Sequence, residues 1–244
     1  MPCPRVSYII ASTMRTGSYL LCEALEATGR AGHPREIFCP ERRGMYEGEW
    51  QLPKGVALDD FMRVAIEQGT SENGVFGTKI HYHHVEPVAR EAQLTGEPVQ
   101  VLRKFFPGAK YIHLRRRDRR GQAISWYRAK VTNEWWRIPG VTQPDLTRKV
   151  PEFHAPEIRR REFELERQQQ EWDRFFADPA VESIAMDYEV LATNYREEVA
   201  RVLAFIGEDL ALAQELPEPR LQVQADATTE EWRARMDALY PPAG

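Results

Sequence analysis

Short apolar runs alternate along this chain with longer stretches in which apolar residues recur every three or four positions. Two of the runs, residues 6–11 and 109–114, have the length and composition of buried β-strands. A segment with helical spacing follows each of them: the first stops at Gly29, and the second extends from Asp118 to about Lys130. This alternation of strands and helices predicts an α/β fold with a parallel sheet.

The second half of the chain continues the pattern. Residues 155–176 form a long polar segment with aromatic and aliphatic positions at helical spacing, which predicts an amphipathic helix that serves packing and forms no site. Residues 181–186 predict a further strand, and the helix after it stops at Gly207. Because no repeat and no Gly/Ser-rich linker divides the sequence, we expect a single domain over residues 1–244.

The turn between the first strand and the first helix, Ser12-Thr13-Met14-Arg15-Thr16-Gly17-Ser18, has the composition of a phosphate cradle. Unpaired backbone N–H groups and the helix dipole favour an anion at a helix N-terminus. Gly17 lets the backbone approach the anion, and Arg15 supplies a full positive charge. The hydroxyls of Thr16 and Ser18 add donors. An ordinary strand-to-helix turn is the alternative for this segment taken alone.

This turn differs from the usual nucleotide-triphosphate loop, which has two glycines and a Lys directly before Ser or Thr. Ser12 stands at the position of the first glycine, and the cation, Arg15, comes two residues before Gly17. A fixed guanidinium without an evident metal partner suits a phosphate ester that is neutralised without a divalent ion. The loop therefore favours a nucleotide ligand other than a magnesium-bound triphosphate.

A second basic segment follows the strand at residues 109–114, where five of the six positions from 115 to 120 are arginine. The chain as a whole is acidic, with 33 Lys and Arg against 37 Asp and Glu and a formal net charge of −4, so this density is local and nucleic acid is not the expected partner. Asp118 is a typical N-cap for the following helix, and Ser125 lies on the same helix face. A strand-end arginine and Ser125 can clamp a second phosphate; a solvated charge run is the alternative.

Four segments carry motifs in a fixed order: the loop at 12–21, Gly32-His33-Pro34-Arg35-Glu36-Ile37-Phe38, the strand Gly77-Thr78-Lys79-Ile80, and the region 112–129. Together they resemble the sulfotransferases that use 3′-phosphoadenosine 5′-phosphosulfate (PAPS), and within them the bacterial branch typified by trehalose 2-sulfotransferase. The resemblance implies a phosphate-loop (P-loop) α/β fold, with a central parallel sheet flanked by helices. It also implies transfer of a sulfuryl group to a hydroxyl by in-line displacement.

The resemblance also implies roles for particular residues. Glu36 would take the proton of the acceptor hydroxyl, a role for which several histidines also compete, while Arg15 and Lys79 would neutralise the transferring and leaving groups. The product would be adenosine 3′,5′-bisphosphate, and no metal is expected. The cofactor-binding residues would be Arg15, Thr16, Gly17, Ser18, Tyr19, Arg116, Arg117, Ser125 and Gln224. One departure concerns Gln224, because Val223 stands before it where the branch has an Arg.

The acceptor is expected to be a hydroxyl of a carbohydrate or another small metabolite. Indole rings stack on sugars and imidazoles hydrogen-bond to hydroxyls, which makes Trp50, Trp135, His33 and His83 the candidate acceptor-binding residues. Residues 42–73 and 132–156 match no motif, and segments so placed shape the acceptor pocket in this family. No Cys, Asp or Glu ligand set surrounds the histidines at 81–84 in the sequence, so we expect no metal site there.

Two other functions stay open at this point. An apolar strand followed by Asp187 is also what a magnesium-dependent small-molecule or nucleotide kinase would show, although the loop lacks the kinase's Lys. The third possibility is a non-catalytic nucleotide-binding protein.

The three cysteines fit no metal-ligand spacing and predict reduced thiols. No apolar run reaches the ~18 residues of a membrane helix, so we expect a cytoplasmic location. The resemblance and the tryptophans after Thr132 predict a homodimer.

Overall fold

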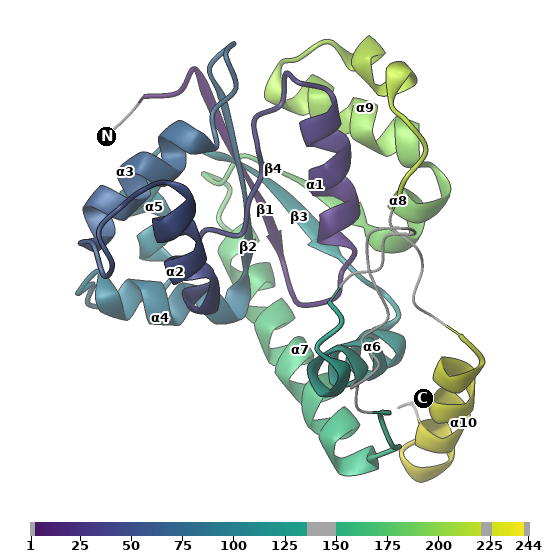
Figure 1. Cartoon of the computed structure of the whole chain (residues 1–244). Helices are drawn as coiled ribbons and strands as arrows, with labels where there is room; N and C mark the ends of the chain where they lie inside the picture. The colour runs from purple at the N-terminus through teal and green to yellow at the C-terminus, as the bar shows by residue number, and fades with distance from the viewer. Residues whose placement is uncertain (1–2, 136–149, 221–225, 242–244) are drawn as a thin grey trace.

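The computed structural model describes residues 3–135, 150–220 and 226–241. A four-stranded parallel sheet with the order β2-β1-β3-β4 lies at its centre (Figure 1). The strands are β1 (Val6–Ser12), β2 (Val75–His81), β3 (Lys110–Arg115) and β4 (Ser183–Asp187). The predicted α/β fold with a central parallel sheet is confirmed.

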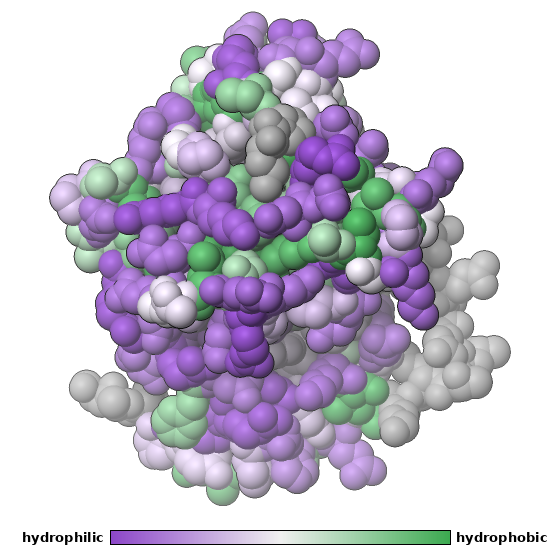
Figure 2. All heavy atoms as spheres, turned by 90° about the vertical axis from the view of Figure 1, so that its left-hand side faces the viewer, coloured by the Kyte–Doolittle hydropathy of each residue, from purple (hydrophilic) through white to green (hydrophobic). Residues whose placement is uncertain are grey.

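Helices cover both faces of the sheet. Alternate side chains of β1 point to opposite sides, so that Ile9 and Ala11 enter one apolar cluster while Tyr8 and Ile10 enter another. The first cluster packs under α2 (Pro40–Glu49), α3 (Leu58–Gln68), α4 (Val85–Glu91), α5 (Gln100–Phe105) and the end of α7 (Ala155–Phe176). The outer face of α2 to α5 is largely hydrophilic, with apolar residues visible between the polar ones (Figure 2).

The second cluster joins the other face of the sheet to α1 (Ser18–Ala27), α8 (Tyr188–Thr193), α9 (Tyr195–Ile206) and the short helix η2 (Leu210–Glu215). A third cluster lies beyond the sheet, where α6 (Arg119–Thr132), α7 and α10 (Ala227–Leu239) pack together in the lower part of Figure 1. Trp126, Leu165 and Trp232 are buried in it. This third cluster extends the fold past the carboxyl ends of the strands, where the site lies.

Local sequence signals account for several element ends. Asp118 is the N-cap of α6, and its side chain accepts a hydrogen bond from the Gly121 N–H at 3.0 Å, as the sequence predicted. The helix α9 ends at Gly207, whose φ of 79° is left-handed. The long amphipathic helix spans the residues that its pattern predicted. Within the described ranges, no helix is both long and apolar enough to cross a membrane.

The carboxyl ends of the strands position the chain segments that form the site. Ser12 pairs with His81 at the ends of β1 and β2, so the phosphate loop and the short helix η1 (Tyr82–His84) leave the same edge of the sheet. The Lys79 N–H donates to the Arg35 carbonyl at 3.0 Å. The segment that carries Glu36 is therefore held along β2, beside Lys79.

Candidate active site

A pocket of about 680 Å³ opens at the carboxyl edge of the sheet. Its lining comes from the phosphate loop and α1, the segment around Glu36, the residues that follow β2 and β3, and helices α2, α6, α7, α8 and α10. We call it the central pocket. Most of the residues that the sequence singled out meet in it, although they lie far apart along the chain.

Gly17 shapes the phosphate loop through its backbone. Its φ of 73° is left-handed, and it is the N-cap of α1. A Cβ at this position would lie 2.2 Å from a ring carbon of Tyr188, so the ring also excludes any side chain there. Both constraints require glycine. Gly17 and Ser18 both line the central pocket, so the N-terminus of α1 faces it.

Hydrogen bonds from outside the loop hold it in place. The Gln122 side-chain amide donates to the Thr13 hydroxyl at 2.9 Å and to the Met14 carbonyl at 2.6 Å. The Thr16 hydroxyl donates to the Thr13 carbonyl at 2.8 Å, and the Thr16 residue is fully buried. The expected role of this hydroxyl as a donor to an anion is therefore corrected, because the hydroxyl closes the loop itself.

Arg15 lies where the two predicted phosphate sites meet. Its Nε donates to the Ser125 hydroxyl at 2.9 Å, its Nη1 donates to the Trp135 carbonyl, and its own carbonyl accepts from Arg116 Nη1 at 3.2 Å. Burial and the nearby Arg116 lower the pKa of Arg15 to about 10, so the Arg15 guanidinium remains charged at neutral pH. Arg15 and Arg116 bring two positive side chains to one pocket, and an anion bound there would offset their repulsion. The pair therefore favours an anionic ligand.

Arg116 is held by a carboxylate. Its Nη2 lies 3.4 Å from Asp118 Oδ2, and its guanidinium lies 5.0 Å from the centre of the Tyr188 ring. Arg233 of α10 donates to both Asp118 oxygens at 2.7 Å. Burial raises the pKa of the Asp118 carboxyl, but the hydrogen bonds from Arg233 and Gly121 outweigh burial and bring it to about 2. Arg116 and Ser125 both line the central pocket, as the second-phosphate prediction requires.

Arg117 does not share this position. Its side chain is 68% exposed, it donates to Asp187 at 2.9 and 2.5 Å, and it is not among the lining residues of the central pocket. We therefore withdraw it as a substitute for Arg116. Asp187 also pairs with Arg115 at 3.2 Å, so two arginines engage the carboxylate that the kinase hypothesis needed for magnesium.

Glu36 lines the central pocket and forms a buried ion pair with Lys79, which is not itself among the lining residues. Lys79 Nζ lies 2.9 Å from Glu36 Oε2, and 3.5 Å from the centre of the Tyr19 ring. The Tyr19 hydroxyl donates to the same carboxylate oxygen at 3.3 Å. Lys79 is only 1% exposed, so it is a buried residue and not a surface lysine.

Two imidazoles face the other oxygen of Glu36. His81 Nε2 and His84 Nδ1 lie 3.6 and 3.5 Å from Glu36 Oε1, and His81 Nδ1 lies 2.9 Å from the Ser12 hydroxyl. Burial raises the pKa of the Glu36 carboxyl, but Lys79 and then the two imidazoles outweigh burial and hold it well below its usual range. Burial lowers the pKa of His84 to about 3. At neutral pH, Glu36 is therefore ionised and His84 is neutral.

Of the four candidate acceptor residues, His83 and Trp135 line the central pocket. His33 does not, and its Nδ1 lies 3.2 Å from Glu26 of α1. Trp50 stacks on Tyr46 at 4.7 Å between ring centres, within the apolar cluster under α2 and α3. We do not carry these two into the acceptor site. Gln224 lies outside the described residues.

Sequence analysis missed several residues of the pocket wall. Arg161 belongs to α7, the helix expected only to pack, yet it lines the central pocket and its guanidinium lies 4.7 Å from the centre of the Trp126 ring. Thr229 arrives from α10, and Arg42, whose Nε lies 4.0 Å from Glu36, arrives from α2. Arg161 and Thr229 come from segments without a recognised motif. A charged position on the apolar face of a helix was the only signal for Arg161.

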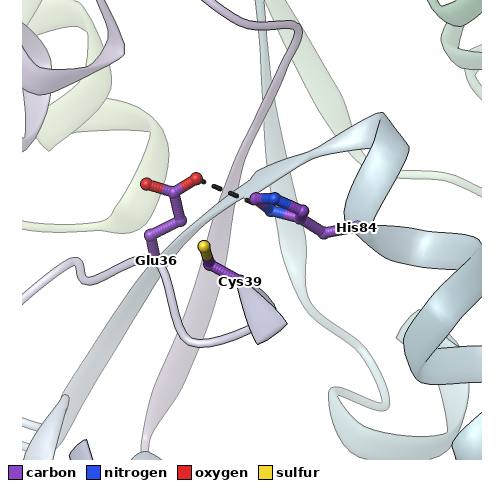
Figure 3. Close-up of side chains that lie close together, drawn as sticks. All are labelled: Glu36, Cys39 and His84. Carbon is purple, nitrogen blue, oxygen red and sulfur yellow. Dashed lines mark ion pairs between the residues drawn. The ribbon is translucent and has the colours of Figure 1, made fainter. Parts of the chain in front are cut away.

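Side chains of metal-ligating types meet at one of the histidines in space, although no such set surrounds the histidines in the sequence. Glu36, Cys39 and His84 place one ligand atom each within 4.8 Å of one another (Figure 3). Glu36 and Cys39 lie far from His84 along the chain, so the sequence around His84 does not show them. They come close to His84 because their segment is held along β2. The three cysteines are free thiols, as predicted.

Comparison with known proteins decides the family. The profile of the Stf0 sulphotransferase family matches residues 7–238. The chain belongs to the Stf0 sulphotransferase family. It is 30% identical to the trehalose 2-sulfotransferase of Mycolicibacterium smegmatis over an alignment of 265 positions, with 95% of each chain covered. It is 31% identical to that of Mycobacterium tuberculosis over an alignment of 267 positions, with 97% of this chain and 96% of the other covered.

A solved structure supports the same fold. The sulfotransferase from Alicyclobacillus acidocaldarius superposes with a TM-score of 0.52 at 14% identity, with 97% of this chain and 96% of that chain covered. Membership in the Stf0 family and the two curated relatives make the protein a sulfotransferase enzyme. The resemblance found from the four sequence motifs is confirmed.

Proposed function

We propose that this sulfotransferase takes its sulfuryl group from PAPS and transfers it to a hydroxyl of a carbohydrate. Trehalose, which the names of the two curated relatives contain, is the first acceptor to test. One observation carries the donor assignment: the loop cation Arg15 and the strand-end cation Arg116 face one pocket, with Ser125 beside them. PAPS has phosphates at both the 5′ and the 3′ positions of one nucleoside.

In this proposal the phosphate loop binds the 5′-phosphosulfate. The N-terminus of α1 and the guanidinium of Arg15 neutralise the 5′-phosphate, which is the leaving group. Arg116 and Ser125 bind the 3′-phosphate, and Asp118 with Arg233 fixes the orientation of Arg116. The reacting groups need only positioning and charge neutralisation, for which these residues suffice.

During transfer, the acceptor oxygen attacks sulfur while the bond from sulfur to the bridging oxygen breaks. The electron pair of that bond goes to the 5′-phosphate, and adenosine 3′,5′-bisphosphate leaves. Lys79 turns from Glu36 toward the sulfuryl oxygens when the donor binds. The loss of this close positive charge raises the pKa of Glu36, because Lys79 is the largest of the influences that lower it.

The proton of the acceptor hydroxyl passes to Glu36 in the same step. While it is paired with Lys79, the Glu36 carboxylate is a weak base. When donor binding draws Lys79 away, Glu36 becomes a stronger base. A neutral imidazole is the competing base, and burial lowers the pKa of His83 as well as that of His84. We assign the base to Glu36 because its carboxylate lines the pocket and is ionised at neutral pH.

The acceptor side of the pocket is assigned to His83, Trp126, Trp135 and Arg161. The His83 and Trp126 ring centres lie 6.2 Å apart, and Arg161 lies behind Trp126. An indole face and a neutral imidazole suit a neutral polyhydroxylated ring.

We also propose that two chains pair as a homodimer, as the sequence resemblance implies. A mass of a single chain in light scattering would contradict this proposal.

The test of the proposed reaction is a mass-spectrometric assay with donor that carries labelled sulfur. Trehalose, glucose, a glycolipid and a phenol serve as acceptors, and product mass and adenosine 3′,5′-bisphosphate are both quantified. We expect a carbohydrate to gain one labelled sulfuryl group for each bisphosphate released. Tight binding of the bisphosphate without transfer to any acceptor would favour a non-catalytic nucleotide-binding protein. Labelling of the phenol alone would move the acceptor out of the carbohydrates.

A further inference from the structure

Three side chains of different chemistry converge on the wall of the central pocket. Glu36, Cys39 and His84 are 6%, 9% and 5% exposed, and a carboxylate oxygen, Sγ and a ring nitrogen lie within 4.8 Å of one another. Figure 3 shows the carboxylate facing the His84 ring, with the Cys39 sulfur directed toward the same space. We call these three residues the Glu-Cys-His trio.

One donor atom of the trio has no hydrogen-bond partner. His84 Nδ1 is buried and unpaired among the described residues, although it points at Glu36 Oε1 from 3.5 Å. Buried polar nitrogens are nearly always hydrogen-bonded, so an unpaired one facing two further ligand atoms indicates room for a shared partner. A cation bound by all three residues would satisfy this nitrogen.

The spacing and the donor set favour one class of metal. Zinc ligands at ~2.0–2.1 Å in a tetrahedron lie about 3.3 Å apart, close to the distance of 3.5 Å between Glu36 Oε1 and His84 Nδ1. A thiolate together with an imidazole selects zinc over magnesium or calcium, which take oxygen ligands. Lys79 contacts the opposite oxygen, Oε2, and all three residues of the trio line the central pocket.

We propose that the Glu-Cys-His trio is an inhibitory site for a thiophilic divalent cation, for which Zn²⁺ is the probe. The metal enters from solution through the central pocket, and the Cys39 thiol releases its proton to solvent as the sulfur–metal bond forms. A coordinated Glu36 carboxylate no longer accepts the acceptor's proton, so bound metal stops transfer. The inhibitory effect rests on the proposed function of Glu36, whereas the metal binding does not.

Binding is tested without substrate, on the full chain, with Co²⁺ as a coloured substitute for Zn²⁺. A thiolate-to-cobalt charge-transfer band in the near ultraviolet is expected to saturate at one ion per chain. Cys39→Ser should abolish the band, and His84→Asn should weaken Zn²⁺ binding at least ~10-fold. Cys3→Ser is the matched control, because Cys3 is an exposed free thiol outside the trio. A band that survives Cys39→Ser, or disappears in Cys3→Ser, would overturn the site.

A second measurement uses only the wild-type chain, so it does not depend on whether a variant folds. Zn²⁺ should slow alkylation of Cys39 at least ~10-fold, as read by peptide mass mapping, and should leave the rate at Cys3 unchanged. Equal rates at Cys39 with and without Zn²⁺ would reject the site. In the transfer assay, Zn²⁺ should inhibit and EDTA should restore activity; zinc binding without inhibition would reject the inhibitory role while the site itself stood.

Discussion

Lys79 Nζ lies 2.9 Å from Glu36 Oε2, and the two side chains are 1% and 7% exposed. Buried ion pairs contribute little net stability, because the desolvation of both charges offsets their attraction. In the proposed reaction the value of the pair is functional, since it holds a cation and a carboxylate at the central pocket. Substitution of Lys79 tests what the pair contributes to stability, and substitution of Glu36 tests the proposed role of the carboxylate in proton transfer.

Lys79→Met should lower the free energy of unfolding by about 3–5 kcal/mol, because it leaves a buried carboxylate without its cation. Urea denaturation at neutral pH measures the change. The double variant Glu36→Gln/Lys79→Met is the control and should recover most of the loss, since it removes both charges. Wild-type stability in Lys79→Met alone would show that the carboxylate has other compensation.

The pair also predicts a dependence of stability on pH. The folded-state pKa of Glu36 lies well below its unfolded value of about 4.3, so the stabilisation is fully present above that pH and is lost as pH falls toward the folded-state pKa. The pKa of Lys79 is raised, so its contribution is lost only as pH rises above about 10.4. Urea denaturation should show the advantage of wild type over Glu36→Gln shrinking from pH 6 to pH 3. A constant difference would contradict the pairing.

Glu36→Gln should lower turnover by ~10²-fold or more, because the amide cannot accept the acceptor's proton. Affinity for adenosine 3′,5′-bisphosphate should stay unchanged in calorimetry. His33→Asn is the matched control, since His33 lies outside the central pocket. Near-normal turnover in Glu36→Gln, together with a collapse in His83→Asn, would move the base to that imidazole.

Arg116→Ala should weaken binding of adenosine 3′,5′-bisphosphate by at least about tenfold, which corresponds to the ~1.5 kcal/mol or more of a charged hydrogen bond. Adenosine 5′-phosphate, which lacks the 3′-phosphate, should be indifferent to the change. Arg117→Ala should affect neither ligand, because this side chain is exposed and paired with Asp187. Equal losses for both nucleotides in Arg116→Ala would show that Arg116 binds something other than the 3′-phosphate.

Sequence reasoning succeeded where the cause is local. The N-cap at Asp118, the helix end at Gly207 and the buried strand β1 are all set within a few residues. The phosphate loop could therefore be found before its partners were known. Arg15, Gly17 and Ser18 all line the central pocket, and their role in cofactor binding stays a prediction.

Sequence reasoning failed where the outcome depends on tertiary contacts. Arg116 and Arg117 are adjacent and chemically identical, yet only the first faces the pocket, because Asp187 at the end of β4 engages the second. His33 and His83 could not be distinguished until the fold placed only His83 on the central pocket. The Thr16 hydroxyl looked like a ligand donor, but its use within the loop depends on a turn geometry that composition does not specify.

The central claim is that the pocket binds an adenosine with both 3′- and 5′-phosphates and does so without a metal. Calorimetry with adenosine 3′,5′-bisphosphate, ATP and adenosine 5′-phosphate, each in EDTA and in magnesium, tests it most directly. We expect the bisphosphate to bind equally in both conditions and at least ~10-fold more tightly than either other nucleotide, since only it engages both Arg15 and Arg116. A strict requirement for magnesium, or a preference for ATP, would contradict the account.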